Sequence, residues 1–111
     1  MTIIEKIDDI EKKTGFKYKK KALYLIFESI KASGIKNAEE LLYTIRTKIQ
    51  EKYGFLGYSV LKKWGIKETT DIGKILRIFI KESIIKADVE EIFFPDYIDL
   101  EDFIKGDYNF G

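Results

Sequence analysis

The sequence predicts a mainly α protein: a single domain of five helices that ends in a short β-hairpin or an extended arm. Three observations carry this prediction. Apolar residues recur at spacings of three and four in five successive segments, most of which end near a glycine. A hydrophobic content of 45% with 14% aromatics indicates a packed core rather than a disordered chain. The length of 111 residues suits one domain, covering residues 1–111.

The first two helices are expected over residues 2–13 and 16–33. The first carries four isoleucines at helical spacing, is capped by Thr2 and is stopped by Gly15. The second begins with a run of lysines and ends at Gly34, a natural C-terminal cap. Its expected buried face consists of Ala22, Leu23, Ile26, Phe27 and Ile30.

The third and fourth helices follow without a long linker. Asn37 is the expected cap of the third helix, which ends at Tyr53-Gly54. The fourth is short, from Phe55 to Trp64, and Gly57 inside it weakens a helix by about 1 kcal/mol relative to alanine. We therefore expect another helix to pack closely across Gly57.

The fifth helix is expected to begin at Thr69 or Thr70 and to be the most buried, because its apolar face is wide. With the fourth helix and the tight turn at Trp64-Gly65-Ile66, it forms a helix-turn-helix pattern over residues 56–81. Four basic residues lie in the turn and along one face of the fifth helix. They are Lys67, Lys74, Arg77 and Lys81.

This basic face has two interpretations. In the first, the fifth helix is a recognition helix whose basic side chains contact nucleic-acid phosphates. The segment after Ile84 would then be the wing of a winged-helix-like fold. Against that stand a net charge of only +1 and the lack of a run of base-reading Asn, Gln or Ser. Because helices joined by a short turn are common in plain bundles, nucleic-acid binding is the alternative hypothesis.

The pattern changes after Ser83. Ile84–Ala87 and Glu91–Phe94 are predicted as short strands or extended segments. Pro95 ends the second of them, because proline has no backbone N–H to donate to a sheet. Residues 86–111 form an acidic C-terminal arm with eight acids against two bases, whereas the preceding residues carry a charge of +7. We interpret the arm as packed on a basic body. The alternative is that it masks a basic binding surface until a partner displaces it.

Large apolar side chains interrupt this acidic arm. Phe93-Phe94-Pro95 either plugs the core or forms an exposed patch for a partner. The candidate interaction residues of the arm are Phe93, Phe94, Tyr97, Phe103, Tyr108 and Phe110. The leading hypothesis is therefore a non-catalytic protein-interaction module that binds a protein partner or a second copy of itself as a homodimer.

Several kinds of chemistry are excluded by composition. The chain has no Cys and no His, which removes disulfides, Ser-His and Cys-His catalysis and the usual zinc ligands. A group of four acids in the arm lacks the spacing and the glycine of a calcium loop: Asp96, Asp99, Glu101 and Asp102. No phosphate-cradling glycine loop occurs either. We expect no enzymatic activity, no metal and no cofactor.

The chain is expected to be cytoplasmic and to make no membrane contact. Its first residues carry charges throughout, unlike a signal peptide. No apolar run approaches the roughly 20 residues that span a bilayer.

Two single residues have open interpretations. Trp64 is expected in the core, with an exposed binding residue as the alternative. Arg46 either pairs with Asp71 or with an acid of the arm, clamping the arm to the body, or is a plain surface arginine.

A pattern of short motifs runs through nearly the whole chain. Its members are Glu28-Ser29-Ile30, Glu39-Glu40-Leu41-Leu42, Ile45-Arg46, Tyr53-Gly54, Val60-Leu61, Trp64-Gly65-Ile66, Thr69, Asp71-Ile72-Gly73, Ile75, Asp102-Phe103 and Tyr108-Asn109-Phe110. This pattern resembles a family of small uncharacterised bacterial proteins with no established activity. Lys74 and Arg77 stand where that family tends to be acidic or apolar. The resemblance implies a shared fold and no mechanism.

Overall fold

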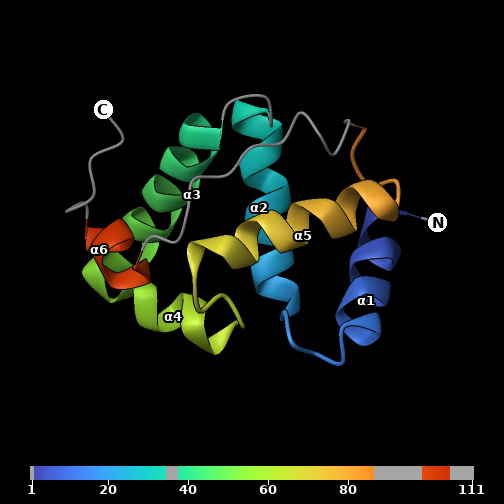
Figure 1. Ribbon diagram of the computed structural model, residues 1–111, viewed down its shortest axis with the longest axis horizontal. Helices are drawn as coiled ribbons and strands as arrows, with labels where there is room; N and C mark the ends of the chain where they lie inside the picture. The colour runs from blue at the N-terminus through green and yellow to red at the C-terminus, as the bar shows by residue number, and fades with distance from the viewer. Residues whose placement is uncertain (1, 35–37, 87–98, 106–111) are drawn as a thin grey trace.

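The computed structural model describes residues 2–34, 38–86 and 99–105, and these are mainly helical (Figure 1). Its elements are α1 (Ile3–Lys13), α2 (Lys20–Ser33), α3 (Ala38–Tyr53), the 3-10 turn η1 (Gly54–Leu56), α4 (Gly57–Lys63), α5 (Thr69–Lys81) and α6 (Leu100–Lys105). Helix α2 lies in the middle, with α1 on one side, α3 on the other and α5 crossing it in front (Figure 1). The prediction of a mainly α fold is confirmed.

The helix starts match the sequence prediction at α1 and differ from it at α5. The Thr2 hydroxyl accepts a hydrogen bond from the Glu5 backbone N–H at 3.1 Å, so the predicted cap is confirmed. At α5 the capping residue is Glu68, not a threonine, and Asp71 accepts from the Glu68 backbone N–H at 3.1 Å. An acid at the third helical position makes this contact, and its charge also suits the positive end of the helix dipole.

Three helices end in the same hydrogen-bonded turn, in which the residue after the C-cap adopts a left-handed conformation. Gly15 takes this position after α1 and Gly65 after α4. After α5 the position belongs to Ser83, with φ +59°. The Ser83 N–H donates to the Ile80 carbonyl at 3.1 Å, and the Ile84 N–H donates to the Phe79 carbonyl at 2.8 Å.

Replacing Ser83 by glycine is expected to stabilise the fold by about 0.5–1 kcal/mol, because a residue with a Cβ is strained in the left-handed region. Greater freedom of glycine in the unfolded chain offsets part of the gain. Urea unfolding of Ser83→Gly against the parent chain measures this difference. Ser59→Gly, inside α4, is the matched control and should lose about 0.5 kcal/mol. Equal destabilisation of both variants would contradict the left-handed conformation of Ser83.

The core is formed by apolar side chains from every α-helix, among them Phe79 of α5 and Phe103 of α6, which are both fully buried. Helix α6 packs on α3 and α4 near the N-terminus of α4. There a Cβ on Gly57 would lie 3.0 Å from the Ile49 side chain and 3.4 Å from that of Ile104. The expected close approach at Gly57 is thus present, and the approaching residues come from α3 and α6.

Two predictions about the C-terminal arm need correction. Residues 100–105 form a helix instead of an extended segment, because Leu100, Phe103 and Ile104 repeat at helical spacing and the Asp99 carboxylate accepts from the Asp102 backbone N–H at 3.1 Å. Residues 84–86 form no strand, and the other predicted strand, 91–94, lies outside the described residues. The β-hairpin, and with it a winged-helix-like arrangement, is therefore unsupported.

Candidate functional site

The turn after α4 is held against the loop between α1 and α2. The Lys19 backbone N–H donates to the Trp64 carbonyl at 2.8 Å. Gly65 has φ +101°, and a Cβ there would lie only 1.8 Å from the Lys17 carbonyl oxygen. Only glycine allows the two backbones to approach this closely. The contact fixes Trp64 relative to the start of α2.

A buried hydrogen-bond network secures the same junction from the α5 side. The Tyr18 hydroxyl donates to Asp71 Oδ1 at 2.7 Å, and the backbone N–H groups of Lys67 and Glu68 donate to Asp71 Oδ2 at 3.0 and 3.1 Å. Burial, and then the hydrogen bond to Asp71, raise the pKa of Tyr18 well above its ordinary value. Tyr18 is therefore a permanent neutral donor, and the network connects the α1–α2 loop to α5.

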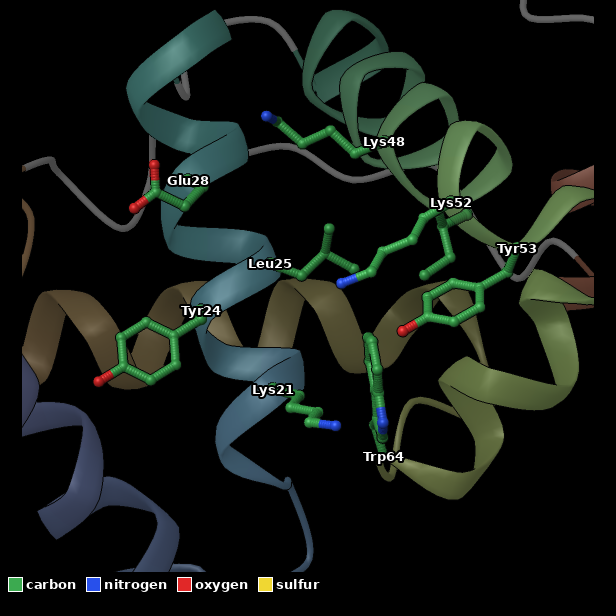
Figure 2. A pocket seen from close by; sticks show the side chains of 9 residues that line it. Lys21, Tyr24, Leu25, Glu28, Lys48, Lys52, Tyr53 and Trp64 are labelled. Atoms are coloured by element: carbon green, nitrogen blue, oxygen red, sulfur yellow. The ribbon is translucent and has the colours of Figure 1, made fainter.

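A groove opens between α2 and α3 beside this junction, with a volume of about 370 Å³ (Figure 2). Helix α2 contributes a stripe at spacings of three and four, which consists of Lys21, Tyr24, Leu25 and Glu28. Helix α3 contributes Lys48, Ile49, Lys52 and Tyr53, and Trp64 closes one end. We call this feature the Trp64 groove. Its exposed surface is mostly apolar.

Trp64 itself is half-buried, intermediate between the two interpretations left open by the sequence. Its ring meets that of Tyr53 edge to face, with centroids 5.9 Å apart and planes at 80°. The two rings lie side by side at one end of the groove (Figure 2). A partner that enters the groove would contact both.

The rim of the groove is positively charged. The amines of Lys21, Lys48 and Lys52 point toward the space between α2 and α3 (Figure 2). Within the described parts of the chain, Lys21 and Lys48 form no ion pair, and Lys52 lies 5.6 Å from the Tyr53 ring centroid. The one acid of the lining, Glu28, lies 3.9 Å from Lys31. The groove is thus lined by three amines and one carboxylate, that of Glu28, so the charge of its rim is positive.

The cations of the helix-turn-helix prediction lie elsewhere. Lys67 and Lys74 line a second cavity of about 380 Å³, together with Lys17 and Asp71. All four predicted residues are exposed, and Arg77 and Lys81 continue the face along α5. Lys74 lies 3.9 Å from Asp71 Oδ1, which offsets part of its charge. Helix α5 crosses in front of α2 in Figure 1 and behind it in Figure 2, so α5 and the Trp64 groove are on opposite sides of α2.

The predicted arm residues are only partly placed. Phe103 is fully buried in the core, which removes it from the set of accessible interaction residues. Phe93, Phe94, Tyr97, Tyr108 and Phe110 lie outside the described residues. Arg46 stacks over the Tyr43 ring at 5.2 Å, whereas Asp71 is held by Tyr18, so the predicted Arg46–Asp71 pair is not formed.

Sequence reasoning missed the Trp64 groove, although one signal was present. Tyr24 and Leu25 are apolar residues on α2 beyond the predicted core face, and with Lys21 and Glu28 they form a second stripe. A helix with apolar residues on two faces has a second surface to cover.

Among residues 2–34, 38–86 and 99–105, no group of three or more acidic side chains is placed to hold a metal ion. In the same residues no helix has the length and apolar character required to cross a bilayer.

No protein-family model matches the chain, and comparison with curated proteins and with solved structures gives no match either.

Proposed function

We propose that this chain is a non-catalytic protein-interaction module that receives its partner in the Trp64 groove. The observation that carries the proposal is the groove itself: a mostly apolar hollow of about 370 Å³ whose one end is formed by Tyr53 and Trp64. Tryptophan and tyrosine are enriched where protein interfaces gain most of their binding energy. Their half-buried rings are already fixed by the core, so little conformational entropy is lost when a partner binds.

The lining of the groove favours binding over catalysis. Its titratable groups are the three lysines, two tyrosines and the single carboxylate of Glu28, which lies beside Lys31. General acid–base chemistry near neutral pH is most often performed by histidine, which the chain lacks, or by paired carboxylates, which the groove lacks.

Site-directed photocrosslinking tests this function. A photoreactive residue is placed at Lys48, in the groove, and in a matched protein at Lys12, an exposed lysine of α1 outside it. After irradiation in cell extract, we expect a discrete, protease-sensitive adduct from position 48 and none from position 12. The purified partner should then shift the emission of Trp64, the single tryptophan. An adduct that forms equally at both positions would contradict the proposal. An adduct with a second copy of the chain would identify the homodimer.

A second candidate function rests on the exposed basic face of α5. Lys67, Lys74, Arg77 and Lys81 are all available to solvent there, as a nucleic-acid-binding helix requires. A photoreactive residue at Arg77 in the same experiment distinguishes the two functions. A nuclease-sensitive adduct at position 77, with none at position 48, would favour nucleic-acid binding and overturn the interaction module.

A further inference from the structure

We infer that the Trp64 groove binds an acidic peptide segment that inserts one large apolar side chain between Leu25 and Trp64. This inference rests on the proposed function, because it names the chemistry of the partner for the same site. It follows from the shape of the groove, from the charge of its rim and from the position of α5, which carries the other candidate basic surface.

The apolar part of the groove determines which kind of side chain the partner inserts, and we call this side chain the anchor. Leu25 and Ile49 form the walls from α2 and α3, and the rings of Tyr53 and Trp64 form the end. A hollow of about 370 Å³ with these walls accepts an aromatic or long aliphatic side chain. A charged side chain in the same place would lose its hydration without gaining a partner.

The rim determines the charge of the residues beside the anchor. Lys21, Lys48 and Lys52 have no ion-pair partner in the described part of the chain, and the Lys52 amine lies 5.6 Å from the Tyr53 ring centroid. Carboxylates that flank the anchor on both sides would meet these amines, and the complementary charge would also speed association. A basic segment would be repelled by the same amines, so the rim selects against it.

The arrangement favours a peptide over a nucleic acid. A single strand requires a positively charged track that follows its backbone over several nucleotides. Helix α5 lies on the opposite side of α2 from the groove (Figure 1, Figure 2), and none of Lys67, Lys74, Arg77 and Lys81 lines the groove. A groove with a closed aromatic end and a short basic rim instead fits one anchor with acidic neighbours.

Fluorescence titration tests the inference, because Trp64 is the single tryptophan and reports on the groove directly. Three short synthetic peptides without Trp or Tyr are compared: Phe flanked by Asp and Glu, the same peptide with Ala in place of Phe, and Phe flanked by Lys. We expect the first to shift the Trp64 emission to saturation and to bind at least about tenfold more tightly than the other two.

Charge-reversal variants locate the binding site. The double variant Lys48→Glu/Lys52→Glu should weaken binding of the acidic peptide by about tenfold or more. The double variant Lys12→Glu/Lys81→Glu changes the net charge equally, involves exposed lysines outside the groove, and should leave the affinity within about twofold of the parent chain. Far-ultraviolet circular dichroism confirms that both variants remain folded.

Four outcomes would overturn the inference: equal binding of the acidic and basic peptides, equal binding with and without Phe, equal weakening by both double variants, or a larger emission shift with a short oligothymidylate. If none of the peptides binds while a protein is crosslinked at position 48, the peptide chemistry is wrong and the interaction module stands. If crosslinking at position 48 also fails, both the peptide chemistry and the proposed interaction module are wrong.

Discussion

Gly65→Ala is expected to lower the free energy of unfolding by about 4 kcal/mol, a large part of the roughly 5–15 kcal/mol that stabilises a domain. A Cβ at this position would lie 1.8 Å from the Lys17 carbonyl oxygen, far inside van der Waals contact. The neighbour is backbone, so the overlap cannot be relieved by a side-chain rotation. The α1–α2 loop would have to move away and would lose the hydrogen bond from Lys19 to Trp64.

A substitution at a second glycine, Gly15, distinguishes the effect of this overlap from the effect of backbone strain. Gly15 occupies the same position in the turn after α1, with φ +62°, but no atom lies within 4 Å of a Cβ built on it. Gly15→Ala therefore measures the left-handed strain alone, about 1–2 kcal/mol. Urea unfolding followed by circular dichroism gives both values. Equal losses in the two variants would contradict the close approach of the Lys17 carbonyl to Gly65.

The elements that the sequence predicts well are those determined by local spacing. The five main helices follow from apolar residues three and four apart, and Thr2 and Gly15 identify the limits of α1 from their own chemistry. The close neighbour predicted at Gly57 is also present, although the predicted helix 55–64 begins later than expected and Gly57 is the first residue of α4. The sequence could not say which neighbour, since Ile104 reaches Gly57 from α6.

The features that the sequence did not predict depend on contacts between distant segments. Helix α6 has only six residues, too few to be stable alone, and is stabilised by packing on α3 and α4. The Trp64 groove exists because of the relative placement of α2, α3 and the end of α4, which no local pattern specifies. Tyr18 finds its partner Asp71 53 positions along the chain. Periodicity carries no information about such a pair.

The bond between Tyr18 and Asp71 is expected to contribute strongly to stability. Asp71→Asn should cost about 3 kcal/mol, because an amide has one acceptor oxygen for three donors and its NH₂ would face at least one of them. Tyr18→Phe should cost about 2 kcal/mol, as expected for loss of a hydrogen bond to a charged group. Because the two residues are in contact, the double variant should lose at least about 1 kcal/mol less than the sum of the single variants. If the stability losses of the two single variants simply add in the double variant, the hydrogen bond between Tyr18 and Asp71 contributes nothing to stability.

The pH dependence of Tyr18→Phe gives an independent check on the environment of the Tyr18 hydroxyl, which is buried and bonded to Asp71. Since the pKa of Tyr18 is raised in the folded state, the unfolded chain releases the phenolic proton first as the pH rises. The contribution of Tyr18 is therefore complete below about pH 10, the ordinary tyrosine value, and falls at higher pH. The stability difference between the parent chain and Tyr18→Phe should accordingly shrink above this pH, whereas Tyr43→Phe, at a side chain 55% exposed, should show a difference near zero throughout. A Tyr18→Phe difference that stays constant across this range would mean that the pKa of Tyr18 is not raised in the folded state.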